Sequence, residues 1–210
     1  MQYPDAMILV YAKAPVAGQV NTRLIPDIGV ETATALHTEL LERRLQQLAE
    51  AALCHITLMC APDTTHDFFQ QCRQRYGVAL APQVGDDLGR RMQQGATRAL
   101  ETCEHCIIVG TDAPALGMDA IEQAIVALQQ DTDVVFVPAE DGGYVLIGLN
   151  RVYDCLFENI PWGTDSVLQQ SRQRLAENAI GFRELACSWD IDRPADYQRY
   201  LRMKAAGKRQ

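Results

Sequence analysis

The chain has 210 residues, of which 48% are hydrophobic and 22% charged, with 19 basic and 27 acidic side chains and a formal net charge of −8. This length and composition suit one sizeable buried core, so we expect a single domain over residues 1–210. The acidic balance, the lack of an apolar run of roughly 20 residues and the lack of a basic signal region predict a cytoplasmic protein that binds neither nucleic acid nor membrane.

Strand-like and helix-like segments alternate along the first two thirds of the chain. Residues 7–11 form a continuous apolar run, which is typical of a strand covered on both faces in a parallel sheet. Leucines spaced by three and four residues then predict a long amphipathic helix over 30–51. The alternation predicts right-handed βαβ units. It continues with strands 55–60, 78–82, 106–110 and 134–137 and helices 65–75, 87–101 and 119–129.

The pattern changes in the last third of the chain. Residues 144–149 are strand-like but follow the preceding strand too soon for a crossover helix, so this strand should be antiparallel or part of a separate ribbon. We expect a three-layer α/β/α sandwich with a mostly parallel central sheet. The remaining predicted elements are helices 151–158, 164–177 and 194–205, a strand near 181–187, and a basic tail, 204–209, that continues the last helix into solvent.

Three polar clusters follow buried strands: residues 13–24, 110–112 and 140–143. Parallel strands end at the same edge of a sheet, and open α/β sheets bind their ligands at the carboxyl edge. The three clusters should therefore meet in one site. Their composition favours metal-assisted chemistry on a nucleotide diphosphate.

The first cluster is a glycine-containing loop that can present backbone amides to phosphate oxygens. Arg23 can make bidentate contacts with a diphosphate, and Lys13 can add a point charge. The loop matches neither a Walker loop nor the dinucleotide GxGxxG pattern. A surface loop with solvated cations is the alternative interpretation.

The second cluster places Asp112 directly after a strand, where a carboxylate suits Mg²⁺ or Mn²⁺. Asp190 and Asp192 follow another short strand, and carboxylates from two loops can hold one metal against a diphosphate. Alternatively, Asp112 caps the turn that precedes the next helix.

In the third cluster, Asp141 is followed by Gly142 and Gly143, which allow positive φ and a close approach of the backbone to a sugar or phosphate. The alternative is a tight turn with solvated acids. Elsewhere, Asp87 is expected to cap a helix and Arg91 is a candidate for the site.

Thr164 and Asp165 are expected to cap a later helix, and Trp162 is a candidate wall of an acceptor pocket.

The seven cysteines are interpreted as reduced thiols, because their number is odd and several lie in strand-like segments. Cys103 and Cys106 form one CxxC pair, for which zinc or redox use is the less favoured reading. The four histidines share no ligand spacing.

The motifs appear together, in order, over nearly the whole chain: Lys13-Ala14-Pro15, Gly18, Thr22-Arg23-Leu24, Gln83, Gly85, Asp87-Leu88-Gly89, Arg91-Met92, Gly110-Thr111-Asp112, Asp141-Gly142-Gly143-Tyr144 with Leu146-Ile147-Gly148-Leu149, and Asp190-Ile191-Asp192. In this the chain resembles the bacterial DUF2064 family, described as arsenosugar-biosynthesis-associated glycosyltransferases. It is more distantly similar to molybdopterin-type nucleotidyltransferases. The chain departs from the family at Asn21, where lysine is usual, and at Ala113 and Ala115, where more polar residues are usual.

The resemblance implies a GT-A, or nucleotide-diphospho-sugar transferase, fold of Rossmann-like type. It implies a metal-dependent glycosyltransferase that uses a nucleotide sugar and a small-molecule acceptor, with Mg²⁺ or Mn²⁺ as cofactor. The alternatives are a nucleotidyltransferase that consumes a nucleoside triphosphate and a non-catalytic nucleotide-sugar-binding protein. We expect a monomer or weak homodimer. The predicted site comprises catalytic Asp112 and Asp141, metal-binding Asp112, Asp190 and Asp192, and nucleotide- or phosphate-binding Lys13, Ala14, Pro15, Gly18, Thr22, Arg23, Gly85, Arg91, Gly142 and Gly143.

Overall fold

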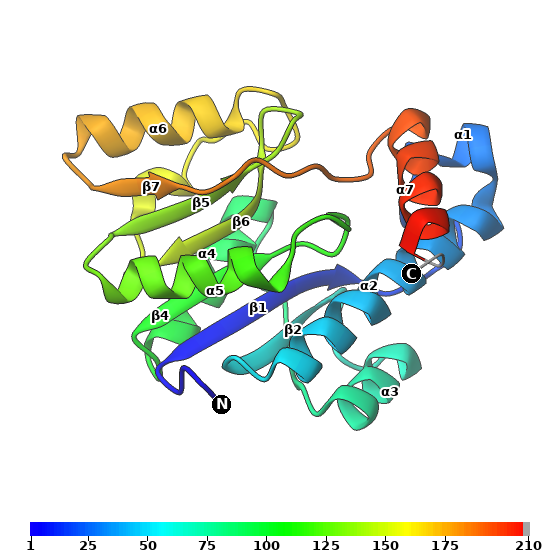
Figure 1. The fold of residues 1–210 in the computed structure, drawn as a ribbon, viewed down its shortest axis with the longest axis horizontal. Coiled ribbons are helices and arrows are strands. Elements are labelled where there is room, and N and C mark those ends of the chain that lie inside the picture. The colour runs from blue at the N-terminus through cyan, green and yellow to red at the C-terminus, as the bar shows by residue number, and fades with distance from the viewer. Residues whose placement is uncertain (208–210) are drawn as a thin grey trace.

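A computed structural model describes residues 1–207 and contains a seven-stranded sheet with the order β3-β2-β1-β4-β6-β5-β7 (Figure 1). All neighbouring strands are parallel except β6, which pairs antiparallel with both β4 and β5. The antiparallel strand predicted over 144–149 is thus confirmed. The strands are β1 (Ala6–Lys13), β2 (His55–Ala61), β3 (Ala79–Pro82), β4 (His105–Val109), β5 (Val134–Pro138), β6 (Tyr144–Leu149) and β7 (Phe182–Glu184).

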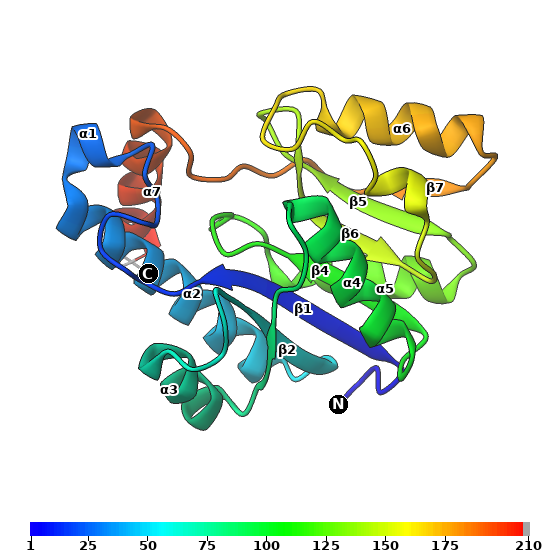
Figure 2. The ribbon, with the colours of Figure 1, turned by 180° about the vertical axis from the view of Figure 1, so that it is seen from behind.

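Helices cover both faces of the sheet and complete the predicted three-layer sandwich. Helices α2, α3 and α5 lie on one face, and α4, η1 and α6 lie on the other (Figures 1 and 2). Buried side chains of the first group belong to one apolar cluster with the sheet, and those of the second group to another. The helices are α1 (Ile25–Ile28), α2 (Val30–Ala51), α3 (Asp67–Tyr76), α4 (Leu88–Leu100), α5 (Met118–Gln129), η1 (Asp154–Leu156), α6 (Val167–Glu177) and α7 (Pro194–Gly207). No helix within residues 1–207 has the length and apolarity needed to cross a membrane.

The segment that leads from β7 to α7 runs across the carboxyl ends of the strands (Figures 1 and 2). It is held there by a bridge between Ala139 and Ser188 and by a hydrogen bond from the Ile191 amide to the Asp112 carbonyl, 2.9 Å. Buried Trp189, Ile191 and Tyr200 then pack with leucines of α2. This crossing brings Asp190 and Asp192 to the same edge of the sheet as Asp112.

Three predictions about the last third need correction. The helix predicted over 151–158 is only the short 3-10 turn η1, and the Arg174 guanidinium, instead of further helical amides, donates hydrogen bonds to the carbonyls of Cys155, Glu158 and Asn159. Helix α6 begins at Val167 after a turn, so its N-cap is Ser166 and neither Thr164 nor Asp165. The predicted strand near 181–187 is limited to β7.

Helix α7 continues to Gly207, and the end of the predicted basic tail, residues 208 and 209, lies outside the described residues. All seven cysteines are free thiols. Cys106 of the CxxC pair is buried in β4, and burial raises its pKa.

Candidate functional site

A groove at the carboxyl edge of the sheet contains adjoining cavities, and three predicted carboxylates lie where they meet. Asp112, Asp141 and Asp190 all line a cavity of about 210 Å³. Asp141 and Asp190 also line a neighbouring cavity of about 480 Å³, which Arg23 and Asp192 border from the other side. Asp112 also lines a third cavity, of about 320 Å³, beside the loop after β1. The prediction that the three polar clusters meet at one edge is therefore confirmed.

Backbone contacts fix the loops that carry these carboxylates. The Asp141 side chain accepts a hydrogen bond from the Gly143 amide, 2.9 Å, which tightens the turn between β5 and β6. Gly142 has φ +93°, and a Cβ there would collide with the carbonyl of Asp165, so this position requires glycine. The paired glycines thus serve the turn, and Gly143 also lines the cavity of about 210 Å³.

The carboxylates repel one another at this edge. Burial, followed by the charges of Asp112 and Asp141, raises the pKa of Asp190 to about 7. Burial also raises the pKa of Asp112, and the charges of Asp192 and Asp141 add to the rise. The Asp112 side chain is open to the cavity, yet protein surrounds it closely enough to limit its hydration. Such an arrangement favours a cation among these oxygen atoms.

Asp112 and Asp190 together fit a magnesium or manganese site of the kind completed by substrate. Within residues 1–207, no three His, Cys, Asp or Glu side chains converge as a closed metal site requires. Mg²⁺ is commonly held by one or two carboxylates together with waters and substrate phosphates, and two carboxylates satisfy that need. The third predicted ligand, Asp192, is engaged in an ion pair with Arg23.

A buried cation lies behind the Asp112 turn. Arg44 of α2 is only 2% exposed, and its guanidinium donates hydrogen bonds to the carbonyls of Ala113, 2.7 Å, and Leu116, 2.8 Å. Burial lowers its pKa to about 10, while the charge of Asp112 opposes that fall. Arg44 therefore holds the turn and offsets part of the negative charge in front of it.

The loop after β1 is held by two side chains that the sequence analysis did not assign. The Gln83 amide donates to the carbonyls of Ala12, 3.1 Å, and Met59, 2.8 Å, and so ties the ends of β1 and β2 together. The buried His37 ring contacts the Lys13 carbonyl at 2.9 Å. Burial lowers the pKa of His37, so its neutral form donates this hydrogen bond. The sequence carries a signal for Gln83 alone, through its match to the family motif, and none for His37.

Asn21 has a structural role in the same loop. Its φ is +47°, a left-handed conformation that asparagine adopts more readily than lysine, and its amide donates to the Ala33 carbonyl at 3.2 Å. Asn21 therefore stabilises the loop and adds no cation to it.

The predicted phosphate-binding residues are distributed unevenly around the groove. Lys13 and Thr22 line the cavity of about 320 Å³, and Arg23 lines the one of about 480 Å³. Ala14 and Arg91 line a fourth cavity on the outer side of Lys13. Pro15, Gly18, Gly85 and Gly142 line none of these four cavities; Gly85 instead accepts a hydrogen bond from the Arg91 side chain, 2.9 Å.

Trp162, the candidate wall of an acceptor pocket, lines the cavity of about 210 Å³. Its ring meets Tyr144 edge-on at 6.4 Å, and on its other side it lies against Gly89 of α4. Gly89 has no room for a Cβ, because such an atom would lie 2.5 Å from the Phe157 carbonyl oxygen and closer still to Trp162. Asp87 caps this helix as predicted, accepting from the Arg90 amide at 2.7 Å.

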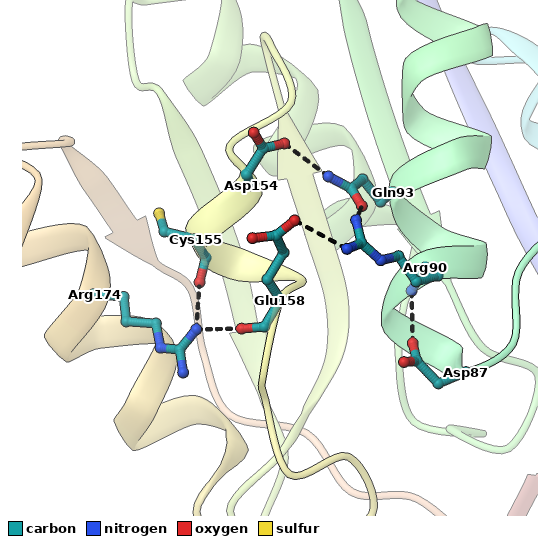
Figure 3. A network of polar contacts seen from close by, with 7 residues as sticks. All are labelled: Asp87, Arg90, Gln93, Asp154, Cys155, Glu158 and Arg174. Carbon is teal, nitrogen blue, oxygen red and sulfur yellow. Dashed lines mark hydrogen bonds and ion pairs between the residues drawn. The ribbon is translucent and has the colours of Figure 1, made fainter.

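A network of polar contacts anchors the segment that carries Trp162 (Figure 3). Arg90 forms an ion pair with Glu158, 3.0 Å, and donates to Gln93, 2.8 Å, which in turn donates to Asp154, 2.7 Å. Arg174 of α6 holds the same segment from the opposite side through backbone carbonyls. The wall is therefore fastened to both α4 and α6.

Three solved structures share this fold. A protein from Desulfovibrio desulfuricans G20, provisionally described as a nucleotide-diphospho-sugar transferase, is 27% identical over 90% of this chain and 83% of its own, with a TM-score of 0.82. CMP:2-keto-3-deoxy-manno-octonic acid synthetase complexed with CTP is 13% identical over 97% and 99%, with a TM-score of 0.61. Glucosyl-3-phosphoglycerate synthase from Mycobacterium tuberculosis, in complex with Mn²⁺, uridine diphosphate and glucosyl-3-phosphoglycerate, is 10% identical over 93% and 75%, with a TM-score of 0.55.

These matches confirm the nucleotide-diphospho-sugar transferase fold that the motifs implied. No curated protein matches the sequence significantly. A family model described as "Uncharacterized protein conserved in bacteria (DUF2064)" matches residues 44–164, which is more than half of the chain. The chain belongs to the DUF2064 family.

Proposed function

We propose that this protein is a metal-dependent glycosyltransferase that moves a sugar from a nucleotide-diphosphate donor to a hydroxyl group of a small-molecule acceptor. The observation that carries the proposal is the position of Asp112, Asp141 and Asp190 between a loop with cations and an apolar cavity. The first environment suits the nucleotide and its phosphates, and the second suits an acceptor. The likeness to the Desulfovibrio protein supports the proposal.

Each side of the groove has a role in the proposed reaction. The nucleotide lies along the loop after β1, where Lys13 and Thr22 face one cavity, and Arg23 reaches the diphosphate once it leaves Asp192. The bond from the anomeric carbon to the diphosphate breaks, the acceptor oxygen bonds to that carbon, and the nucleoside diphosphate leaves. Asp141 orients the sugar or accepts the acceptor's proton.

Asp112 and Asp190 would hold the divalent metal, which supplies charge stabilisation to the departing diphosphate. Arg44 keeps the Asp112 turn in place from behind without reaching the ligand. The Mn²⁺ of the mycobacterial synthase complex supports the assignment of a divalent cofactor by fold analogy.

The second candidate is a nucleotidyltransferase, in which a phosphorylated acceptor attacks a nucleoside triphosphate and pyrophosphate leaves. The fold shared with the CTP-complexed synthetase favours it. Asn21 counts against it, because expulsion of pyrophosphate calls for positive charge, and this loop carries an amide where the resemblance to the family implies lysine. The third candidate, a binding protein without turnover, keeps the same ligands but releases no product.

Product analysis distinguishes the three candidates. The protein is incubated with nucleotide sugars or nucleoside triphosphates, Mn²⁺ and a panel of alcohols, and nucleoside diphosphate and pyrophosphate are quantified. Release of nucleoside diphosphate from a nucleotide sugar, lost in Asp112→Asn and retained in the control Asp119→Asn on the surface of α5, supports glycosyl transfer. Pyrophosphate release supports nucleotidyl transfer, and metal-dependent binding without either product supports the third candidate.

A further inference from the structure

The cavity walled by Trp162 is mainly apolar, and no cationic side chain of residues 1–207 lines it. It is about 210 Å³ in volume, and its walls come from β1, β4, β6, α4, α6 and the segment before α6. Its apolar lining is Tyr11, Leu88, Met92, Ile108, Val109, Tyr144, Val145, Ile147, Trp162 and Val167. Its charged groups are the carboxyl groups of Asp112, Asp141 and Asp190.

The neighbouring cations lie outside the lining of this cavity, and Lys13 lines the cavity of about 320 Å³ beside it. Arg44 lies behind the Asp112 turn and donates to backbone carbonyls. Arg90 forms an ion pair with Glu158 and does not line the cavity (Figure 3). Arg23 and Arg193 line the adjoining cavity of about 480 Å³, where Arg23 is paired with Asp192. An anionic group inside the apolar cavity would therefore meet carboxylates without a counter-charge.

A bound metal and donor do not reverse this balance. A divalent ion adds two positive charges, and the diphosphate that accompanies it adds at least two negative charges. The cavity therefore stays free of net positive charge when donor and metal are both present. The Tyr144 hydroxyl is buried and has no hydrogen-bond partner among the described residues, and Thr164 is a further neutral polar residue of the wall.

From this lining we infer that the acceptor has a ring-sized apolar body with an uncharged or cationic character, and that phosphorylated and carboxylated acceptors are excluded. This inference rests on the proposed function, which makes the ligand of the cavity an acceptor. The preference of the cavity for uncharged or cationic ligands follows from its lining alone. The apolar body packs against Trp162 and Tyr144, and a hydroxyl at its end faces Asp141. The same lining is unsuited to the phosphorylated acceptor that the nucleotidyltransferase candidate needs.

Trp162 itself provides the binding assay. The chain has two tryptophans, so Trp189→Phe leaves Trp162 as the sole indole reporter. Its emission is followed during titration with 2-phenylethanol, 2-phenylethylamine and 2-phenylethyl phosphate, with and without Mn²⁺ and a nucleoside diphosphate. We expect the alcohol and the amine to bind at least about tenfold more tightly than the phosphate ester. Equal or tighter binding of the phosphate ester, or no response to any probe, overturns the inference.

A charge inserted into the wall gives the complementary test. Thr164 is exposed and lines the cavity, so Thr164→Lys supplies the missing cation. We expect it to improve binding of 2-phenylethyl phosphate by about tenfold and to weaken binding of the amine. The control Gln169→Lys places the same charge on the exposed side of α6 and should change neither. An unchanged selectivity in Thr164→Lys overturns the inference. Because no donor or turnover is needed, a failure of glycosyl transfer does not affect this readout.

Discussion

Gly89→Ala is a sharp test of how the cavity wall is positioned. Gly89 is buried in the first turn of α4, in contact with the Trp162 ring. A methyl group there would lie 2.5 Å from the Phe157 carbonyl oxygen and would overlap the indole nitrogen. The Phe157 oxygen belongs to the backbone and cannot rotate away, so the wall itself must shift.

Two opposing effects set the expected change in stability. Alanine is favoured over glycine in a helix interior by about 1 kcal/mol. Overpacking of a filled site costs about 1–3 kcal/mol. The net expectation is a loss of about 0–2 kcal/mol in the free energy of unfolding. The functional effect should be larger, because the displaced part is the wall that contacts the acceptor.

Urea unfolding measures the change in stability. Trp162 emission in the Trp189→Phe background measures the displacement of the wall. We expect altered emission and at least about tenfold weaker binding of 2-phenylethanol. The control Gln94→Ala lies on the exposed side of the same helix and should leave emission and binding unchanged. A Gly89→Ala protein that is stabilised by the full helix-propensity gain, with unchanged emission and binding, would refute this reasoning.

Three further changes test other parts of the site. In Gly110→Ala the new methyl group lies 2.7 Å from the Asp112 carboxylate oxygen, which can rotate away. We therefore expect a change in unfolding free energy below about 1 kcal/mol but a clear loss of the metal-dependent thermal shift that a nucleotide sugar gives. An unaltered thermal shift would contradict the role of Asp112. In Arg44→Met, removal of the buried charge returns about 3 kcal/mol, given the fall of its pKa from 12.5 to about 10, while two orphaned carbonyls cost about 1–3 kcal/mol each. Urea unfolding should therefore show a net loss no larger than about 3 kcal/mol, and a greater loss would mean that the guanidinium contributes beyond these two hydrogen bonds. Glu158→Gln breaks an exposed ion pair with Arg90, so its cost in the same assay should be about 0–1 kcal/mol, and a loss above 2 kcal/mol would show that the network acts as a unit.

The sheet and the meeting of its carboxylates could be predicted because both follow from local pattern and chain topology. Continuous apolar runs marked the strands, and the short connection before residues 144–149 predicted an antiparallel strand or a separate ribbon, of which the structure has the first. Asp112 and Asp141 meet because the segments that precede them end at the same edge. Asp190 joins them because its segment crosses that edge on the way to α7.

The supporting contacts could not be predicted because they join residues far apart in sequence. The periodicity of α2 does not show what the Arg44 side chain contacts. Its contact with the turn after Asp112 is visible only in the folded chain. The ion pair of Arg23 with Asp192 depends on how α7 returns to the loop after β1. Residues 151–158 form only one 3-10 turn, and the carbonyls of this segment accept hydrogen bonds from Arg174 of α6, a residue distant in sequence.

A thermal-shift comparison of the wild type with Asp112→Ala tests the central claim most directly. Nucleotide sugars, nucleoside diphosphates and nucleoside triphosphates are each added with Mg²⁺, with Mn²⁺ and with a chelator. Ligands that bind the native state raise the unfolding midpoint by mass action. We expect a metal-dependent rise with a nucleotide sugar or diphosphate that disappears in Asp112→Ala. The absence of a shift with every nucleotide, or a shift that Asp112→Ala retains in full, would contradict the account.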